Sequence, residues 1–279
     1  MLVTTAEFIT ERDFRRISDA VYEYCGINLH DGKRELVQAR LAKRLRQTGV
    51  QNVSAYLDGV LARPDSEEFT QLINCLTTNL TSFFRESAHF QFLAEKFLPE
   101  LMARKRRAGI NRIRAWSAGC STGEEPYSLA IQLLDSLGDG SWDVRILATD
   151  ISTHVLRIAE NGLYEKSRVE SVPPALRHKS LIPERQAGSV AYRVAPQVRS
   201  LVRFAYLNLM ESWPFNGTFD FIFCRNVMIY FDKPTQQKLV NRFWDRLEKG
   251  GVLFTGHSES LTGIEHSFRY IQPTIYGRH

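Results

Sequence analysis

The stretch over residues 114–130, RAWSAGCSTGEEPYSLA, constrains the fold of this chain more than any other. Branched and aromatic residues over 113–116 predict a brief buried strand. The small residues 119–123 let the backbone turn sharply and approach a ligand. Acids and a proline at 124–126 suit the first turn of a helix, and the leucines behind them form its apolar face. Strand, glycine turn and helix are together the opening unit of a nucleotide-type binding fold.

Two common phosphate-binding motifs are absent from this glycine turn. Its glycines do not follow the G-x-G-x-x-G pattern of dinucleotide-binding folds, and no Lys-Ser/Thr pair follows the second glycine as in a P-loop. Local spacing therefore leaves open an ordinary tight connection between a strand and a helix.

The next predicted strand, 143–149, ends in Asp150. In nucleotide-type folds an acid at the carboxyl end of the second strand accepts hydrogen bonds from ribose hydroxyls. The glycine turn precedes Asp150 by the expected ~20 or more residues, which favours this role. Asp150 could instead cap the helix that begins near residue 152, or do both.

Composition bounds the class of protein. The 279 residues suffice for one large domain or two unequal ones, and 43% hydrophobic with 24% charged residues predicts a folded globular protein. No apolar run is long enough to span a bilayer, and the first residues lack a signal-peptide core. Four scattered cysteines without metal-ligand spacing fit buried thiols in a reducing cytosol. The net charge of +5 permits an acidic partner, either nucleic acid or an acidic protein surface.

The first 75 residues or so are predicted to be helical. The expected helices cover residues 11–24, 31–47, 54–61 and a fourth from 67. In the second helix, Val37, Leu41 and Leu45 share one side. Four basic residues lie roughly opposite: Lys33, Arg40, Lys43 and Arg44. This basic set is either a solvated face or a docking face for an acidic partner.

The segment 77–86, TTNLTSFFRE, suits neither helix nor strand. It precedes a predicted helix over 89–102. Phe83 and Phe84 could plug the space between two domains, and Arg85 alone would be read as a helix-end salt-bridge partner. The segment therefore predicts a linker between the helical part and the glycine-turn unit.

Strands and helices alternate through the rest of the chain. We expect helices at 153–160 and 233–248, a turn at 250–251, and strands at 201–207, 218–224, 252–255 and 268–276. Residues 163–201 break the pattern and predict an inserted flap with a candidate strand near 190–194. The alternation predicts a mostly parallel sheet with helices on both faces, whose ligands bind beyond the carboxyl ends of the strands. The following residues lie at such ends: Gly119, Asp150, Asn208, Arg225 and Asn226.

Several blocks, in order and over nearly the whole length, resemble the CheR family of chemotaxis receptor methyltransferases. The blocks are TTNLTSFFRE, AWSAGCSTGEEPYSLA, ATDIS, FCRNVMIYF and GHSESL, with YCGINL and the basic helix after it near the start. The resemblance implies an α/β chain with an all-helical domain over 1–76 and a linker and helix over 77–110. A Rossmann-like S-adenosylmethionine-dependent methyltransferase domain then covers 111–279, with a small antiparallel β-subdomain at about 163–200.

The resemblance also implies an activity, a protein-glutamate O-methyltransferase that serves sensory adaptation. It would use S-adenosylmethionine, without a metal, to convert receptor glutamates to methyl esters and leave S-adenosylhomocysteine. The implied partners are the cytoplasmic domains of transmembrane chemotaxis receptors, met at the basic helix, and in some members a receptor's C-terminal peptide at the β-subdomain. Nucleic-acid binding and membrane insertion are not expected, and the protein would be cytoplasmic and recruited to receptor arrays.

Site residues are implied position by position. Arg85 and Tyr230 resemble the pair placed beside the transferred methyl group. The residues that resemble cofactor contacts are Asn79, Thr81, Arg85, Gly119, Glu125, Asp150, Asn208, Leu209, Arg225 and Asn226. His257 is expected to be structural.

A carboxylate acceptor is already a nucleophile at neutral pH, so the absence of a Ser-His-Asp or Cys-His arrangement is no objection. Two competing functions remain open. A nucleic-acid methyltransferase would suit the positive charge, but Arg225-Asn226-Val227 stands where an N/D-P-P-Y/F block would be expected. A non-catalytic adaptor that binds the cofactor product would not require Arg85 and Tyr230.

Overall fold

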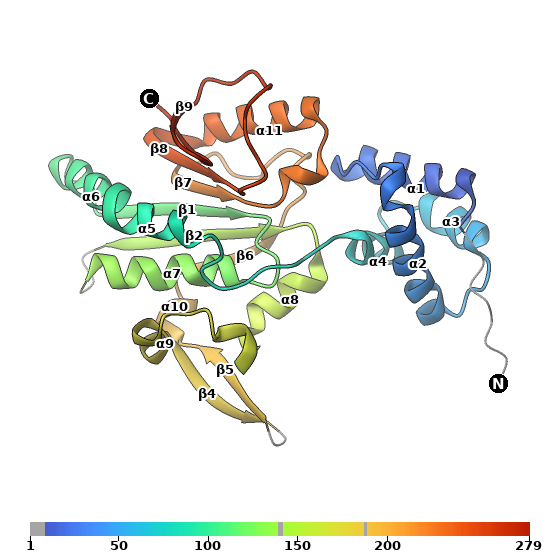
Figure 1. Cartoon of the computed structure of the whole chain (residues 1–279), viewed down its shortest axis with the longest axis horizontal. Coiled ribbons are helices and arrows are strands. Elements are labelled where there is room, and N and C mark those ends of the chain that lie inside the picture. Colours follow the sequence, from blue (N-terminus) through green and yellow to red (C-terminus); the bar gives the residue numbers. More distant parts are fainter. Residues whose placement is uncertain (1–8, 139–141, 187–188) are drawn as a thin grey trace.

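Helices at the amino-terminal end of the chain pack around a hydrophobic core of their own (Figure 1). The computed structural model describes residues 9–138, 142–186 and 189–279; residues 1–8 of the expected first domain and 187–188 of the expected β-subdomain lie outside these ranges. The helices are α1 (Glu11–Cys25), α2 (Arg34–Thr48), α3 (Val53–Leu61) and α4 (Glu67–Leu76). Thr10, Asn52 and Ser66 accept hydrogen bonds from backbone N–H groups at helix starts.

The second helix presents its predicted apolar side to this core, because Val37, Leu41 and Leu45 are all buried. Both α1 and α2 have 15 residues, whereas a bilayer span needs about 20 apolar ones. None of the helices in the described ranges is both long and apolar enough to cross a membrane.

An extended linker leads from α4 into a long helical segment. This segment comprises α5 (Ser87–Phe92), a π-helical turn (Leu93–Phe97) and α6 (Leu98–Arg107). It starts earlier and ends later than the predicted 89–102, and so includes the basic residues 104–107 in its last turn. Cations suit that position because the carboxyl end of a helix is partly negative.

The rest of the chain builds a seven-stranded sheet in the order β6-β2-β1-β7-β8-β10-β9. The strands are β1 (Arg112–Ala118), β2 (Asp143–Asp150), β6 (Val202–Tyr206), β7 (Phe219–Cys224), β8 (Leu247–Thr255), β9 (Arg269–Gln272) and β10 (Ile275–Gly277). The first five strands in this order are parallel, and β10 and β9 add an antiparallel edge. All six residues of β7 are buried, as its apolar sequence predicts for a strand covered on both faces.

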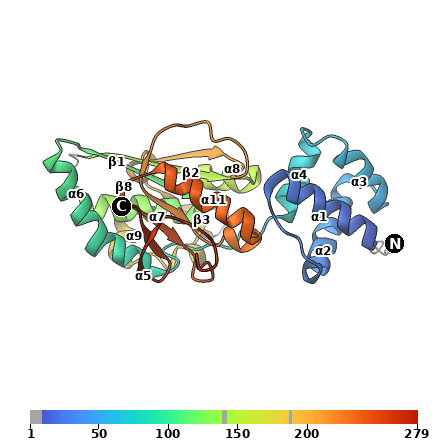
Figure 2. The same ribbon diagram turned by 90° about the horizontal axis from the view of Figure 1, so that it is seen from above.

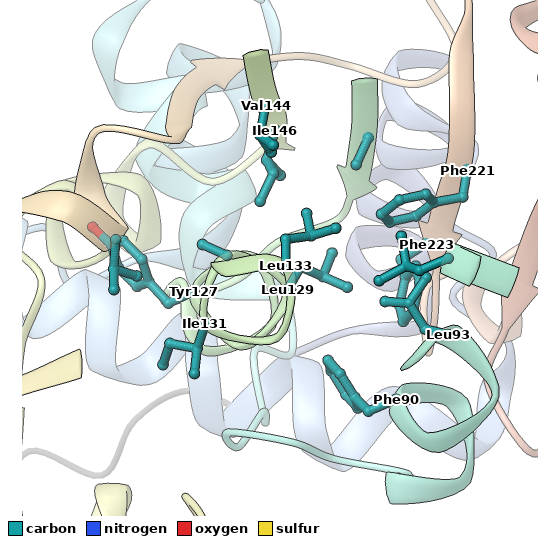
Figure 3. Packing of buried hydrophobic residues seen from close by; sticks show 14 of the residues in the cluster. Phe90, Leu93, Tyr127, Leu129, Ile131, Leu133, Val144, Ile146, Phe221 and Phe223 are labelled. Atoms are coloured by element: carbon teal, nitrogen blue, oxygen red, sulfur yellow. The ribbon is translucent and has the colours of Figure 1, made fainter. Parts of the chain in front are cut away.

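Helices cover both faces of the sheet, as the alternating pattern predicts. On one face, α7 (Glu124–Leu137) and the α5–α6 segment pack against Phe221, Phe223 and Ile146 (Figure 3). The same face carries α8 (Thr153–Asn161), which contacts β2 and β6. On the other face, α11 (Lys233–Arg246) buries its apolar side against a cluster centred on Trp116.

The predicted flap is a small antiparallel sheet below the main one in Figure 1. Its strands run in the order β3-β5-β4: β3 (Leu163–Glu165), β5 (Ser189–Val194) and β4 (Leu181–Gln186). Short helices α9 (Pro174–Ser180) and α10 (Pro196–Arg199) flank them. The insertion therefore has more regular structure than the single candidate strand found from the sequence pattern.

Two local predictions near the carboxyl end are wrong. The expected single strand 268–276 is a hairpin, because Pro273 and Thr274, with φ of 65°, reverse the chain between β9 and β10. The expected turn at 250–251 lies inside β8, where Gly250 has φ of 72° and the pairing with β7 is irregular. A glycine in this conformation forms a bulge without ending the strand.

Hydrogen bonds join helices α1 to α4, called the helical body below, to the carboxyl ends of the parallel strands. The Asn208 side chain donates to the Tyr24 carbonyl at 2.6 Å, and the Asn28 N–H donates to the Tyr230 carbonyl at 2.7 Å. The hydroxyls of Tyr24 and Tyr206 lie 2.8 Å apart. Figure 2 shows the two bodies side by side. The carboxyl end of α1 is thereby held against the strand ends.

Replacing Phe223 by alanine should lower the free energy of unfolding by about 3–5 kcal/mol. Phe223 is fully buried, and its ring stacks on that of Phe254 with centroids 4.2 Å apart. Urea unfolding followed by circular dichroism measures the change. Tyr270→Ala is the control, since Tyr270 is 59% exposed and should cost no more than about 0.5 kcal/mol. Equal losses in both variants would contradict this account of the core.

Candidate active site

A cavity lies where the carboxyl ends of the parallel strands meet the linker and the helical body. Its empty volume, including the part open to solvent, is about 1130 Å³. The predicted residues that line it are Asn79, Thr81, Arg85, Gly119, Glu125, Asp150, Asn208, Leu209, Arg225, Asn226 and Tyr230. The structure therefore brings the predicted catalytic pair and the predicted cofactor contacts to a single cavity.

The turn after β1 has a conformation that glycine alone accommodates easily. Gly119 has φ of 81°, and a Cβ placed there would lie 2.3 Å from Cγ2 of Val227. Ser121 donates a hydrogen bond from its hydroxyl to the Asn79 carbonyl at 2.8 Å. The turn thus packs tightly against the residues after β7 and is bonded to the linker.

Asp150 ends β2 with its carboxylate at the cavity. It accepts hydrogen bonds from the backbone N–H groups of Ser121 at 2.8 Å and Ser152 at 2.9 Å. Burial raises the pKa of Asp150, and these two backbone donors oppose the rise. The cap of α8 is Ser152, whose hydroxyl accepts from Val155 N–H. The alternative reading of Asp150 as that helix cap is therefore wrong.

Two linker residues have a backbone conformation that residues other than glycine rarely adopt. Phe84 has φ of 51° and Glu86 has φ of 57°, which costs on the order of 1–2 kcal/mol at each residue. Phe83 is buried edge-on to the Tyr164 ring at 5.0 Å, and Phe84 N–H donates to Ser128 Oγ at 2.9 Å. Arg85, the next residue, lines the cavity and donates a hydrogen bond to the Leu80 carbonyl at 2.8 Å.

Arg225, predicted as a cofactor contact, uses most of its guanidinium inside the protein. Its Nε donates to Glu125 at 2.7 Å and its Nη1 donates to the Arg85 carbonyl at 2.5 Å. Ser117 Oγ donates to the other Glu125 oxygen at 2.7 Å. Since the side chain of Arg225 is 2% exposed, it borders the cavity while bonding mainly to protein groups.

Sequence reasoning assigned no role to Glu259, which orders the loop after β7. Its carboxylate accepts from the backbone N–H groups of Asn226 at 2.7 Å, Ile229 at 3.1 Å and Gly256 at 2.6 Å. Burial raises the pKa of Glu259, against the effect of these donors. The position of this acid, just after the last parallel strand, was the available sequence indication.

Tyr230 and Lys33 meet at the side of the cavity formed by the helical body. The ammonium of Lys33 lies 4.9 Å from the centre of the Tyr230 ring, and both residues line the cavity. Burial lowers the pKa of Lys33, and the charge of Arg40 lowers it further. The predicted docking set therefore has one member at the cavity itself.

The other predicted docking residues differ in how free they are. Arg40 donates to the Leu76 carbonyl at 2.5 Å and to Thr78 Oγ1 at 2.8 Å. Arg44 pairs with Glu68, which also accepts from the Tyr56 hydroxyl. Lys43 is exposed. Arg40 and Arg44 thus also support the linker and the helical core.

Glu86, His89 and His257 form the kind of cluster that can hold a metal ion, with ligand atoms within 4.8 Å of one another. Arg225 Nη1 lies 3.4 Å from Oε2 of Glu86 and 3.3 Å from Nδ1 of His89. A guanidinium so close repels a second cation and supplies the positive charge itself. The donor set therefore fits an internal ion pair better than a metal.

The residues present fit S-adenosylmethionine, the methyl donor implied by the family resemblance. Asp150 offers its carboxylate for ribose hydroxyls, and Gly119 lines the same cavity. Glu125 also lines the cavity, with its carboxylate paired with Arg225.

Comparisons with known proteins find similar sequences over most of the chain. The family model described as "CheR methyltransferase, SAM binding domain" matches residues 79–276, and the one described as "CheR methyltransferase, all-alpha domain" matches residues 12–77. The "Chemotaxis protein methyltransferase" of Klebsiella aerogenes is 42% identical over 270 residues, covering 96% of this chain and 90% of that protein. The Escherichia coli protein of the same name is 40% identical over 269 residues, covering 96% and 91%. A "Probable chemotaxis protein methyltransferase" of Rhizobium etli is 42% identical over 258 residues, covering 92% and 96%.

His89 should make the fold sensitive to acid. Burial, with the charges of Arg225 and His257, lowers the pKa of His89 to about 3. The unfolded chain takes up this proton near pH 6.5 and the folded chain only near pH 3, so stability is lost as pH falls through that window. The loss should approach about 1.4 kcal/mol per pH unit.

Urea titrations between pH 7 and 4 measure this slope. His89→Gln should flatten it, whereas replacement of the exposed His178 by glutamine should leave it unchanged. An unaltered slope in His89→Gln would show that other groups carry the acid sensitivity.

Proposed function

The chain belongs to the CheR methyltransferase family, and we propose that it methylates specific glutamate side chains of chemotaxis receptors from S-adenosylmethionine. The products would be glutamate methyl esters and S-adenosylhomocysteine, in the adaptation step of bacterial chemotaxis. The observation that carries the proposal is the convergence of Arg85 and Tyr230 with Asp150 and the Gly119 turn on one cavity. The same cavity has a wall from the helical body, where a protein substrate can be recognised.

Binding of the methyl donor is assigned to the strand ends and the linker. Asp150 would accept from ribose hydroxyls, while Asn79 and Thr81 offer polar side chains in the same cavity. Asn208 also lines it, with its side chain bonded to the backbone of Tyr24 and Met210. The donor supplies a methyl group on a positively charged sulfur. Arg225 and Asn226 also line the cavity, and Glu259 accepts a hydrogen bond from the backbone N–H of Asn226. We assign the site no metal, because Arg225 already provides the cation that the nearest acid and histidines could bind.

The chemistry asks little of the protein beyond orientation and removal of water. A receptor glutamate is ionised at neutral pH, so no residue need remove a proton. Arg85 can present paired N–H donors that aim a carboxylate. Too strong a grip would stabilise the reactant more than the transition state, in which the carboxylate charge is falling. Arg85 therefore acts mainly by orientation, and the Tyr230 hydroxyl offers a hydrogen bond near the acceptor oxygen.

Apolar side chains of the helical body line part of the cavity. Two opposite charges disappear during methyl transfer, so a site poor in water favours the reaction. Buried residues of the helical body, Cys25, Leu29 and Leu76, line the cavity together with the strand ends. The helical body therefore contributes to the site as well as to receptor docking.

Receptor docking is assigned to the exposed part of α2 around Lys43, facing acidic receptor helices. A receptor's C-terminal peptide would add to the edge strand β4 of the small sheet, where Ile182 is 49% exposed. These contacts would recruit the protein to receptor arrays in the cytoplasm.

One labelling experiment separates this function from its two competitors. The protein is incubated with S-adenosylmethionine that carries a tritiated methyl group, and with either receptor-containing membranes or nucleic acid. The proposed function predicts base-labile label on receptor protein in the membranes. Label on nucleic acid would identify a nucleic-acid methyltransferase, and no label with retained S-adenosylhomocysteine binding would identify an adaptor.

Arg85→Ala should slow methyl transfer at least about tenfold, which is 1.4 kcal/mol in the activation barrier. The fold should stay intact, because the Arg85 side chain is partly exposed and donates its hydrogen bond to a carbonyl within the linker, that of Leu80. Initial rates with labelled donor and receptor membranes measure the effect. Arg107→Ala, an exposed arginine at the end of α6, is the matched control. Near-normal turnover in Arg85→Ala would refute its assignment.

Lys43→Glu should weaken receptor methylation without changing the core. Exposed ion pairs contribute about 0.5–1 kcal/mol, so KM for receptor membranes should rise roughly two- to fivefold at low salt. The difference should shrink as salt is added. Reversing Arg40 or Arg44 is less informative, because each also bonds within the protein. Lys249→Glu, which makes the same charge change at the start of β8, should leave KM unaltered; an equal effect there would indicate net charge alone.

A further inference from the structure

Glu86 is held in an unfavourable backbone conformation immediately after Arg85. Its φ of 57° lies in the left-handed region, where an L-residue with a long side chain is strained. Its carboxylate is 9% exposed and accepts from His257 N–H at 3.2 Å. The other oxygen lies 3.4 Å from Arg225 Nη1. Such a conformation persists only where surrounding contacts hold it.

Arg225 connects this part of the linker to the helix of the glycine turn. One edge of its guanidinium bonds Glu125 on α7, and Nη1 bonds the Arg85 carbonyl at 2.5 Å and faces Glu86. The aromatic rings of Phe90 and Phe223 lie 5.6 and 5.2 Å from its Cζ. A single buried side chain therefore joins the linker, α7 and the end of β7.

The contacts of Arg225 require a fork of donors. Glu125 and the Arg85 carbonyl are met by different nitrogens of one rigid plane, which a lysine ammonium cannot reproduce. The neighbouring His89 stays uncharged near neutral pH, since its pKa is lowered to about 3. The two carboxylates that face Arg225 thus bind a single cation in a nearly water-free place.

We propose that Glu86 and Arg225 are positioning residues that hold the linker backbone so that the Arg85 side chain faces the cavity. Arg225 acts on methyl transfer through the Arg85 carbonyl rather than by binding the methyl donor. The inference rests on the proposed function for its effect on rate, while its effect on the linker can be measured without any reaction. It differs from the sequence-based prediction, which made Arg225 a cofactor contact.

The test compares Arg225→Lys and Glu86→Gln with the wild-type protein. Arg225→Lys keeps the charge and loses the fork, and Glu86→Gln keeps the shape and loses the charge. Turnover is measured with saturating labelled donor and receptor membranes, and S-adenosylhomocysteine affinity by calorimetry. Amide hydrogen exchange reports the linker, where Phe84 N–H is bonded to Ser128. The control is Arg278→Lys, an arginine that also bonds backbone carbonyls and stacks on a ring, that of Trp244.

Turnover should fall at least tenfold in both variants, with S-adenosylhomocysteine affinity within threefold of wild type. In both variants, amide exchange at Phe84 should quicken at least tenfold and exchange in α11 should stay unchanged. In Arg278→Lys, turnover, S-adenosylhomocysteine affinity and exchange at Phe84 should match the wild type. Affinity that falls in step with turnover would show that Arg225 binds the donor, and would overturn the proposal. Unchanged exchange at Phe84 would overturn it too.

Two further results keep the outcomes distinct. If Arg225→Lys does not fold, Glu86→Gln and Glu86→Gly decide: glycine relieves the strained φ but removes the carboxylate, so both must lose turnover. Normal turnover in Glu86→Gly would mean that the carboxylate is needed only while the backbone at this position is strained, which would contradict the proposal. A further outcome is that the wild-type protein labels no receptor while Arg225→Lys still shows faster hydrogen exchange in the linker. That pair of results would reject the proposed function and leave the linker role intact.

Discussion

The ion pair between Arg225 and Glu125 is the interaction on which the arrangement of the site depends. It joins the end of one central strand to the helix that follows another, and both side chains are more than nine-tenths buried. Removing one partner of such a pair typically costs about 3–5 kcal/mol, because the other charge is left in a medium that solvates it poorly. Arg225 bonds the linker at the Arg85 carbonyl, and the loop ordered by Glu259 begins at the next residue, Asn226.

Much of the fold could be predicted because its determinants are local. Alternating strand and helix patterns predicted a mostly parallel sheet, and the buried residues of α2 and β7 lie where their sequence patterns predict. The carboxyl ends of parallel strands share an edge, so Gly119, Asp150 and Asn208 could be placed together without tertiary information. The hairpin at Thr274 and the bulge at Gly250 were missed, since a single residue with positive φ decides each.

The site was predicted less completely, for reasons that are equally physical. Charged side chains can reach several partners, and only the tertiary structure shows which one they take. Arg44 bonds Glu68 from another helix, and Lys33 lies at the cavity beside Tyr230. Glu259 binds three backbone N–H groups that belong to two loops. No periodicity or spacing encodes such contacts.

The contact of Asn208 with the helical body has a consequence for how the helical part can vary in sequence. Asn208 donates to the main-chain carbonyl of Tyr24, and Asn28 N–H donates to the main-chain carbonyl of Tyr230. Neither acceptor depends on which side chain its residue carries. Substitutions on the outer surface of the helical part would therefore leave both bonds available, so that surface can change in sequence while the catalytic part is left untouched.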